Sequence, residues 1–486
     1  MNIFDKTLAR STSRRTPTHQ PQQRRGWLYQ LLRRLHFYAG IFVGPFILIA
    51  ALSGALYAMT PQIEQALYAK ELHAPLAQDY LPLSQQVQAA NDYLGLGQSP
   101  LAVRPAPNPG DTTRVMYLGE GLGPSESRAI FIDPATAEVR GDLTVYGTSG
   151  SLPLRTWIDQ VHRNLHLGEA GRLYSELAAS WLGIIAVAGL GLWIMRATRS
   201  KQKKNLSRPG HKAQGFRRLA NLHTSLGLWV LLGAVFLSAT GITWSTYGGA
   251  NVGKLRAALS WQTPAVNTSL ADQPMDMTGE HAEHHHHAMG MMDHSVDPIM
   301  FDHVLTAAKD ENIDTGLLEI KPPAAADQAW VVQEIKRSFP TQIDQVAIDG
   351  NSLNVVDRND FADYGLAAKL SRWGIDAHMG TLFGLPNQIL LLALALSIAA
   401  MVVLGYLMWW KRRPTKIENR RMGNLPARGG FVRAPWWGCA LVVIIALVLG
   451  AFLPLLGTSL ALFLVVDFLV VYTARFRGAV AGKAEH

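Results

Sequence analysis

The chain has 486 residues, 48% of them hydrophobic, and a formal net charge of +9. Its single cysteine, Cys439, excludes disulfides within the chain, iron–sulfur clusters held by several cysteines and covalent C-x-x-C-H attachment of haem. Six apolar runs approach the roughly 20 residues that cross a bilayer, and none has Lys or Arg at its centre. These runs, which we interpret as membrane helices, cover about 36–60, 174–195, 222–246, 387–410, 436–453 and 455–474.

Basic residues gather in three places beside these runs, which explains the net charge, so we expect no nucleic-acid partner. By the positive-inside rule these segments, and both termini, lie in the cytoplasm. The N-terminal tail holds Arg14, Arg15, Arg24, Arg25, Arg33 and Arg34. The connection 196–218 holds Arg196, Arg199, Lys201, Lys203, Lys204, Arg208, Lys212, Arg217 and Arg218. The connection 411–433 holds Lys411, Arg412, Arg413, Arg420, Arg421, Arg428 and Arg433.

This topology divides the chain into alternating membrane and soluble segments, with the lipid bilayer as its first partner. We interpret the first span as an uncleaved anchor. The predicted order is a basic cytoplasmic tail (1–35), span 1 (36–60), external domain 1 (61–155), a re-entry helix with span 2 (156–198), a cytoplasmic loop (199–218), span 3 (219–247), external domain 2 (248–370), a re-entry helix with span 4 (371–411), a cytoplasmic loop (412–435), a hairpin of spans 5 and 6 (436–475) and a cytoplasmic tail (476–486).

The first external segment is expected to be a small α+β module. Residues 83–94 have the apolar spacing of a helix, and 113–118 alternate like a strand. Residues 128–140 indicate a strand, a turn and a second strand. Residues 151–168 then predict an amphipathic helix that returns to the membrane and is broken by Gly168–Gly171.

The second external segment repeats this plan and carries an insertion in front of it. Residues 301–312 predict a helix, 329–335 a strand, and 345–357 a hairpin. The insertion, 275–294, has almost nothing apolar to bury, so we expect a loop without a core. Its candidate metal ligands are His281, His284, His285, His286, His287, Met289, Met291, Met292 and His294.

The chain contains an internal duplication. With a shift of 187, Leu35-His36, Gly40, Gly54 and Tyr57 recur as Leu222-His223, Gly227, Gly241 and Trp244. With a shift of 216, Trp157, His162, Gly168, Gly189, Trp193 and Arg196 recur as Trp373, His378, Gly384, Gly405, Trp409 and Arg412. The change of shift places 29 extra residues in the second external domain. If each first span is one helix, its histidine and its second glycine lie on one face, about 27 Å apart.

Four duplicated histidines are the candidate cofactor ligands. An imidazole in a membrane span is unfavourable unless it is paired or liganded. His36 and His223 lie near the inner face and His162 and His378 near the outer face, so each face receives one histidine from each half. Two histidines that converge across a bundle are the axial ligands of a six-coordinate haem b, which predicts two bis-histidine haems.

Neighbouring residues support or compete with this assignment. Gly40, Gly44, Gly227, Gly54 and Gly241 give clearance for a flat macrocycle, or else only let helices pack closely. Arg33, Arg34, Arg217 and Arg218 at the inner face, and Arg163 and Arg372 at the outer face, are candidate partners for haem propionates. His166 shares a helix face with His162 and is a rival ligand; it aligns with Leu382, whereas His162 aligns with His378.

The insertion combines imidazoles with thioethers, a ligand set that favours copper; nickel or zinc would use the histidines alone. Its position beside the outer pair suits presentation of Cu(II) or Fe(III) for one-electron reduction. The alternative is a solvated linker without specific affinity.

Several of these motifs together resemble the PepSY-associated transmembrane family over about 30–412. They are Leu35-His36, Ser53-Gly54, 161–165 with Gly168–Gly171, 377–388, and the strand–turn–strand 131–139. The resemblance implies a multi-pass protein of the bacterial inner membrane with periplasmic PepSY domains. For the family's siderophore-reductase branch, it implies two b-type haems that carry electrons outward to ferric complexes. Some relatives carry a flavoprotein reductase domain; this chain does not, so its electron donor, a flavoprotein reductase or quinol, is expected to be a separate cytoplasmic-side partner.

The expected fold is therefore a mainly α membrane protein. Two homologous halves form a four-helix transmembrane core with α+β PepSY-like periplasmic domains, and a two-helix hairpin follows. The favoured function is a transmembrane dihaem electron conduit, a ferric-siderophore or cupric reductase in metal acquisition whose acceptor is a periplasmic metal complex. The alternatives are a non-redox metal transporter or delivery protein, and a regulatory PepSY protein that binds a partner. Absorbance of the purified protein separates the first from the other two.

Overall fold

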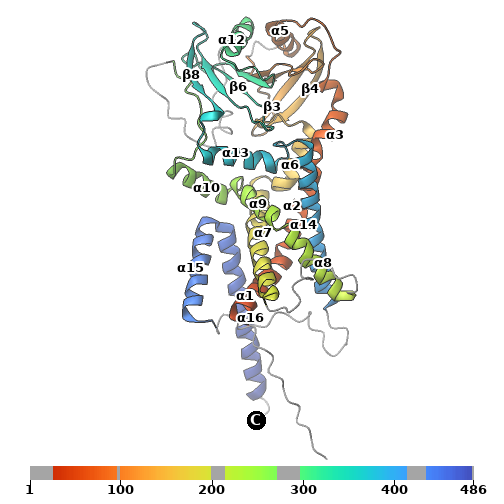
Figure 1. Ribbon diagram of the computed structural model, residues 1–486, viewed down its shortest axis with the longest axis vertical. Coiled ribbons are helices and arrows are strands. Elements are labelled where there is room, and N and C mark those ends of the chain that lie inside the picture. Colours follow the sequence, from red (N-terminus) through yellow and green to blue (C-terminus); the bar gives the residue numbers. More distant parts are fainter. Residues whose placement is uncertain (1–25, 96–98, 199–213, 271–295, 413–433, 484–486) are drawn as a thin grey trace, which may run out of the picture.

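The computed structural model describes residues 26–95, 99–198, 214–270, 296–412 and 434–483. An extramembrane unit built on one β-sheet lies at one end of a bundle of long helices (Figure 1). Two helices that lie across the long axis, α10 (Tyr247–Ala258) and α13 (Leu366–His378), separate the sheet from the bundle. The molecule is thus layered, with the sheet on one side of these helices and the apolar helices on the other.

The bundle contains four helical passages of two kinds. Two helices are long and apolar enough to cross a membrane unaided, α7 (Gly168–Ala197) and α14 (Leu385–Lys411). The other two are bent pairs: α1 (Trp27–Phe42) with α2 (Gly44–Ala58), bent by 62°, and α8 (Gly215–Trp229) with α9 (Leu231–Thr243), bent by 61°. The chain is a membrane-embedded protein, and its described residues contain two such spans, or four if each bent pair is counted as one.

The prediction of one continuous helix from His36 to Gly54, with both on one face, is wrong. In the first copy α2 has Pro45 at its second position, where proline is tolerated but has no N–H to continue the hydrogen bonds of α1. The second copy bends at Val230 without a proline. There Gly233 lets α9 lie against α14, because a Cβ on Gly233 would stand 2.6 Å from Leu394 Cδ2.

The bends determine how the two halves interlock. On one side of its bend, α1 packs on α7, and on the other side α2 packs on α14. The second bent pair does the reverse, since α8 packs on α14 and α9 packs on α7. Each bent pair therefore contacts the straight helices of both halves. The shared apolar core consists of Ala39, Val43, Ile47, Ala178, Trp181, Val230, Ala234, Ile398, Leu453 and Leu456.

A helical hairpin packs on this bundle. Its helices, α15 (Trp436–Phe452) and α16 (Pro454–Lys483), are joined at Leu453, as the predicted tight hairpin requires. Gly450 and Gly457 face each other so closely that a Cβ on Gly450 would lie 3.1 Å from the Gly457 Cα. Trp181 of α7 attaches α16 by a 2.9 Å hydrogen bond from Nε1 to Ser459 Oγ.

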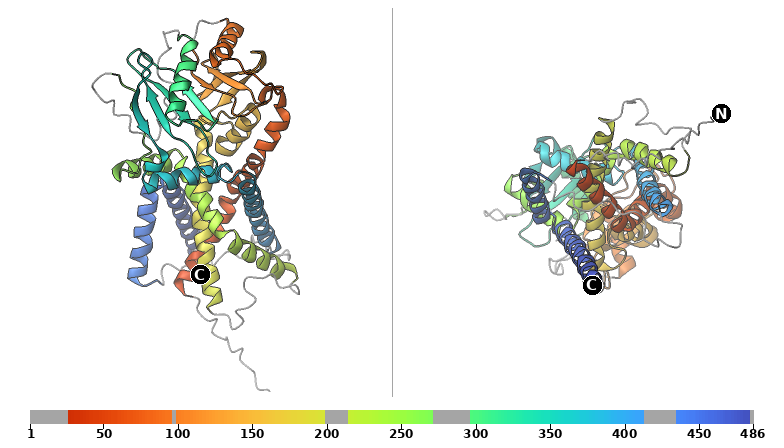
Figure 2. Two further views of the ribbon diagram at one scale, coloured as in Figure 1. Left: turned by 45° about the horizontal axis from the view of Figure 1, so that its top comes forward. Right: turned by 90° about the horizontal axis from the view of Figure 1, so that it is seen from below.

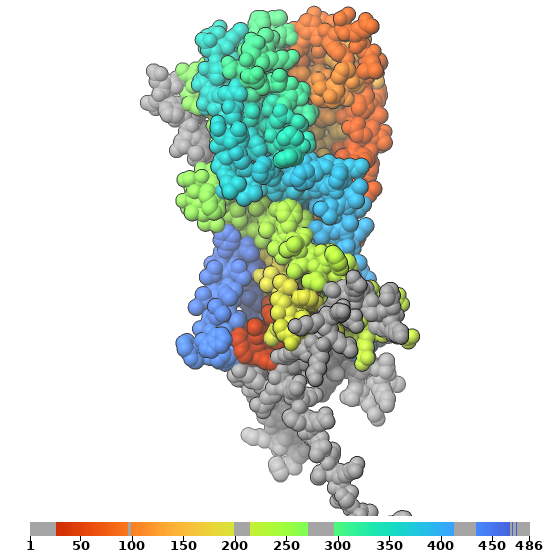
Figure 3. Space-filling view, in the orientation of Figure 1, coloured from red at the N-terminus to blue at the C-terminus, as the bar shows by residue number. Residues whose placement is uncertain are grey.

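The two external segments form one sheet rather than two separate modules. All eight strands are antiparallel to their neighbours, in the order β4-β3-β2-β1-β5-β6-β7-β8, and Val103 opposite Ile320 joins the halves. The halves lie side by side at this seam (Figures 2 and 3). The strands are β1 (Ala102–Arg104), β2 (Thr113–Tyr117), β3 (Glu126–Ile132), β4 (Val139–Tyr146), β5 (Leu318–Lys321), β6 (Trp330–Glu334), β7 (Gln345–Ile348) and β8 (Val355–Asn359).

One face of the sheet is covered by α5 (Leu83–Leu94) and α12 (Ile299–Asp310), one helix from each half. Alternate strand residues point to this face, which gives the period-2 pattern of a half-buried sheet. The predicted helices at 83–94 and 301–312 and the predicted strands at 113–118, 128–133, 329–335 and 345–357 are confirmed within a few residues. The core includes Val87, Val103, Val115, Ile130, Phe301, Ile320, Val332 and Val346.

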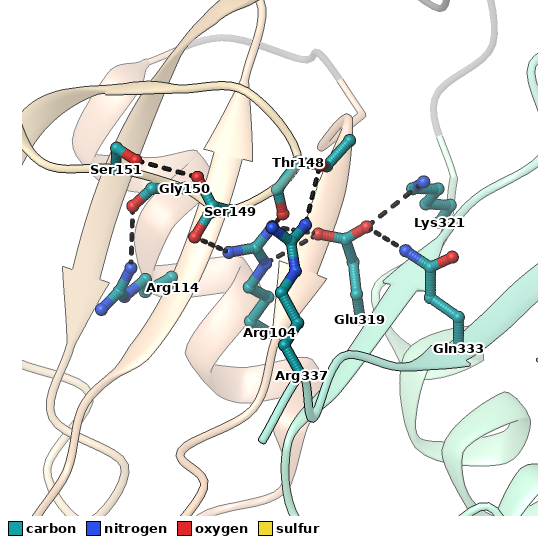
Figure 4. Close-up of polar contacts among 10 residues, drawn as sticks. All are labelled: Arg104, Arg114, Thr148, Ser149, Gly150, Ser151, Glu319, Lys321, Gln333 and Arg337. Atoms are coloured by element: carbon teal, nitrogen blue, oxygen red, sulfur yellow. Dashed lines mark hydrogen bonds and ion pairs between the residues drawn. The ribbon is translucent and has the colours of Figure 1, made fainter. Parts of the chain in front are cut away.

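The opposite face carries a buried ion pair across the seam (Figure 4). Arg104 of β1 donates from Nε to Glu319 Oε2 of β5 at 2.7 Å, and the two side chains are 9% and 3% exposed. Lys321 and Gln333 also contact Glu319, at 3.2 and 2.7 Å. Because both partners are removed from water, this pair depends on the two halves staying together.

Shorter helices connect the sheet to the bundle: α3 (Thr60–Leu67), α4 (Ala69–Leu72), α6 (Pro153–Asn164) and the 3-10 turn Phe361–Asp363, besides α10 and α13. The predicted break after the amphipathic helix is present but begins a few residues earlier than Gly168, because α6 ends at Asn164 and Gly168–Gly171 form the first turn of α7. The chain turns earlier, where Leu165, His166 and Gly168 have φ of 55°, 56° and 59°. Gly171 permits this turn, because a Cβ there would lie 1.7 Å from Asn164 O.

Candidate functional site

The four duplicated histidines lie on four different helices and meet in two pairs. His36 of α1 and His223 of α8 form the distal pair. The helices α1 and α8 lie at the end of the bundle away from the sheet (Figure 1). His162 of α6 and His378 of α13 form the sheet-side pair, where these two helices end. Each pair takes one histidine from each half of the chain, as the duplication predicts.

The distal pair is oriented by backbone carbonyl groups. His36 Nδ1 lies 2.9 Å from Ile185 O of α7, and His223 Nδ1 lies 3.2 Å from Met401 O of α14. A carbonyl oxygen only accepts, so each Nδ1 carries the proton and each Nε2 keeps its lone pair. The ring centres are 6.1 Å apart and the planes are inclined by 80°.

The sheet-side pair is oriented by hydroxyl groups. His162 Nδ1 lies 3.0 Å from Ser53 Oγ, and His378 Nδ1 lies 2.6 Å from Thr240 Oγ1. Ser53 donates its own proton to Ile49 O at 2.8 Å, and Thr240 donates to Phe236 O at 2.7 Å. A hydroxyl has one donor, so each accepts from the ring, and both histidines again present an unprotonated Nε2.

All four contacts follow the internal duplication. Ser53 and Thr240 differ by 187 positions, the shift that relates the first helices of the two halves. Ile185 and Met401 differ by 216, the shift that relates the second helices. Both the histidines and the groups that orient them are therefore repeated. Within each pair, the two histidines are held in the same way by equivalent positions of the two halves. Ser53 and Thr240 can be recognised in the sequence because they lie directly before the repeated residues Gly54 and Gly241. A backbone carbonyl partner has no such sequence signal, because any residue can supply it.

Glycines adjoin the rings, though not in every case those expected. A Cβ on Gly54 would lie 3.2 Å from His162 Cε1, and a Cβ on Gly189 would lie 3.1 Å from His36 Cε1. Gly241 is looser, at 4.0 Å from His378 Cε1. Gly44 and Gly227 instead face Tyr406 and Met401, so they serve helix packing, and a Cβ on Gly40 would meet no atom within 4 Å.

Burial keeps the rings of the sheet-side pair neutral. Burial and the nearby His162 lower the pKa of His378 to about 3. Burial also lowers the pKa of His162, although Asp159 opposes that shift. Neutral imidazole is the form that ligates a metal.

The other predicted site residues are placed as follows. His166 is exposed, with its ring against Trp157 and Nε2 3.1 Å from Trp157 O, and so lies outside the sheet-side pair. Arg372 is bound to the buried Asp376 at 2.9 Å, and Arg163 donates to Tyr146 Oη at 2.7 Å. The His/Met segment 275–294 lies outside the described residues. Elsewhere in the described chain, no group of three His, Cys, Asp or Glu is arranged to hold a metal ion.

Comparison with known proteins agrees with this architecture. The family model described as the PepSY-associated TM region matches residues 33–412, which include all four histidines and both halves of the sheet. No curated protein matches the chain. The duplicated helices, the extramembrane sheet and this match together identify the chain as a membrane-embedded member of the PepSY-associated TM family.

Proposed function

We propose that this protein is a transmembrane electron-transfer protein that holds two b-type haems, one at each histidine pair. The observation that carries the proposal is the repeated orientation of four imidazoles by Nδ1 hydrogen bonds, which leaves four Nε2 atoms as ligands. Hydrogen-bonded Nδ1 atoms are the usual support of metal-ligating histidines, because they fix the ring and its tautomer.

The distances at the distal pair fit one metal atom between the rings. Metal–imidazole bonds of about 2 Å on both sides of an ion place the ring centres about 6 Å apart. The observed separation is 6.1 Å. His36 and His223 would hold this group without a change of position along their helices.

The number of ligands favours a haem over a bare ion. A structural zinc site takes about four protein ligands, whereas each pair offers two imidazoles and the described chain has no cluster of three metal-binding side chains. A porphyrin brings its own in-plane nitrogen ligands and needs only the two axial ones. A haem held by two histidines would supply reversible one-electron exchange. Two imidazoles per site therefore suit a haem better than the bare ion of a non-redox metal transporter.

The rest of the chain suits electron transfer from the cytoplasmic side of the membrane to the periplasm. We propose that the distal pair lies on the cytoplasmic side of a bacterial inner membrane, because basic segments flank that end. The donor is then a separate cytoplasmic-side reductase or quinol. The acceptor is a periplasmic ferric or cupric complex that approaches the sheet-side pair, with 275–294 as a copper-binding segment.

The test is the absorbance of purified protein expressed with added haem. We expect a low-spin b-type spectrum with about two haems per chain. His36→Ala and His223→Ala should each remove the same haem, and His162→Ala and His378→Ala the other. His166→Ala is the matched control and should keep both. A protein without a Soret band, or loss of haem in His166→Ala but not in His162→Ala, would overturn the assignment.

A further inference from the structure

A group of arginines lies between the sheet and the sheet-side pair. Arg155, Asp159 and Arg163 are spaced by four residues along α6, so they share the helix face that also carries His162. Arg155 donates from Nε to Tyr57 Oη at 3.1 Å, and Arg163 donates from Nη1 to Tyr146 Oη at 2.7 Å. Their guanidinium carbons lie 4.9 and 5.9 Å from the centres of the same tyrosine rings.

Both arginines retain buried donors with no acceptor. Arg155 Nη2 and Arg163 Nε are removed from solvent and have no hydrogen-bond partner among the described residues. A buried donor on a charged group is strongly unfavourable when it is unsatisfied. The two nitrogens therefore indicate an acceptor that the described protein does not itself supply.

The surroundings add positive charge. Arg114 donates to Gly150 O and Arg337 to Thr148 Oγ1, at 3.3 and 2.9 Å, on the loop that leads into α6 (Figure 4). Burial and the adjacent Arg104 lower the pKa of Arg114 to about 10, so it remains charged at neutral pH.

The acids nearby do not balance these cations. The cluster has six basic side chains and four carboxylates, Glu64, Asp111, Asp159 and Glu319, which leaves an excess of two positive charges even if all four acids are ionised. The basic side chains are Arg104, Arg114, Arg155, Arg163, Lys321 and Arg337. Glu319 is already paired with Arg104. Burial raises the pKa of Glu64 and of Asp159, although neighbouring arginines oppose this, and so favours their neutral forms.

The arginines are not part of the internal duplication. With the shift of 216 that relates His162 to His378, Arg155, Asp159 and Arg163 correspond to Ser371, Ile375 and Met379. The histidine pair takes one ligand from each half, whereas Arg155 and Arg163 of α6 have no arginine at the equivalent positions of α13. Metal ligation by two equivalent histidines therefore does not explain why Arg155 and Arg163 are present.

We propose that Arg155 and Arg163, supported by Arg114 and Arg337, bind carboxylate groups beside the sheet-side histidine pair. Guanidinium groups pair with carboxylates through two parallel hydrogen bonds and stay charged when buried, which a lysine would not match. The carboxylates have two sources with the same chemistry, the propionates of a haem held by the pair and a citrate-type metal chelate that reaches it. The first source rests on the proposed function, and the second does not.

The test uses the full chain with Arg155→Gln, Arg163→Gln and the double variant. Arg128→Gln, which removes a partly exposed arginine paired with Asp142 at 2.5 Å, is the matched control. One arm measures the rate at which haem leaves each variant for apomyoglobin. The other arm measures binding of gallium citrate by calorimetry, at low and high salt, to protein with and without haem. A melting temperature equal to that of the control establishes folding.

If propionates are the ligand, the double variant should lose one of its haems at least tenfold faster while citrate binding is unchanged. If a chelate is the ligand, citrate affinity should fall at least tenfold, most at low salt, while haem is retained. Arg163→Lys should restore less than half of either effect, because it keeps the charge without the fork geometry. Unchanged haem release and unchanged citrate binding would overturn the proposal. A wild-type protein without haem would refute the proposed function, but the citrate arm would still decide this one.

Discussion

The ion pair Arg104–Glu319 should hold the two halves of the extramembrane sheet together, and Glu319→Gln tests this. Burial would raise the pKa of Glu319, but Arg104 and Lys321 outweigh it and lower the pKa from 4.5 to about 2. The difference between these pKa values corresponds to about 3 kcal/mol of stability at neutral pH. Breaking a buried pair by removing one partner costs about 3–5 kcal/mol, so the two estimates agree.

The lowered pKa of Glu319 also predicts how the stability of the protein changes with pH. Because the folded-state pKa is below the unfolded-state value, the contribution of Glu319 is fully present above about pH 4.5 and is lost as the pH falls toward 2. Wild-type stability should therefore decrease over that window. Glu319→Gln, which has no charge to titrate, should be less stable at pH 7 and should lose less on acidification.

Calorimetry of the purified full chain in one detergent is the assay. At about 2–4 °C per kcal/mol for a unit of this size, Glu319→Gln should lower Tm at pH 7 by roughly 6–12 °C. Arg128→Gln should lower it by less than about 4 °C, because the Arg128–Asp142 pair is partly exposed. The double replacement Arg104→Met with Glu319→Leu should recover most of the loss, since it leaves no unpaired charge. Equal Tm values for wild type and Glu319→Gln, or parallel loss of stability on acidification, would refute the reasoning.

Three further predictions concern the histidine pairs, a helix junction and the His/Met segment. Ser53→Ala and Thr240→Val should each weaken haem retention about 10–100-fold, because each removes the hydrogen bond that orients one histidine Nδ1. Ser180→Ala is the control and should retain haem, because the Ser180 hydroxyl donates to carbonyls of its own helix. Equal haem retention in all three variants would contradict the role assigned to the two hydroxyls. Gly171→Ala should destabilise the protein by about 1–3 kcal/mol in thermal unfolding, because its Cβ meets Asn164 O, whereas Gly253→Ala in open space should stabilise it slightly; the opposite order would refute the packing argument. Deleting 275–294 should leave both haem signals intact and slow reoxidation by Cu(II) more than by a ferric chelate in stopped-flow absorbance; equal rates with and without the segment would make it a passive linker.

The pairing of the four histidines followed more directly from the sequence than the architecture around them did. His36, His223, His162 and His378 were identified because identical residues recur at two fixed shifts, and a repeat keeps its geometry. The regular elements around Leu83–Leu94 and Gln345–Ile348 also followed from periodicity. These features depend on the order of residues along the sequence, so they can be predicted without knowing which distant segments are in contact.

Features that depend on contacts between distant segments were missed. The bends at Val43 and Val230 follow from how each helix pair packs on both α7 and α14, and apolar runs look alike whether straight or bent. The single sheet depends on one residue pair, Val103 opposite Ile320, between strands more than 200 positions apart. The carbonyl partners Ile185 and Met401 contribute only backbone atoms, so their side chains carry no signal.

The interlocked halves divide the support of the two pairs between different parts of the molecule. The distal pair is oriented entirely by α7 and α14, inside the bundle. The sheet-side pair instead comes from α6 and α13, and each of these helices follows one half of the sheet along the chain. The loop between β4 and α6 is bound by Arg104 and Arg337, one from each half. The rings of His162 and His378 are nevertheless oriented from inside the bundle, by Ser53 of α2 and Thr240 of α9. The sheet-side pair therefore depends on both the sheet and the bundle, whereas the distal pair depends on the bundle alone.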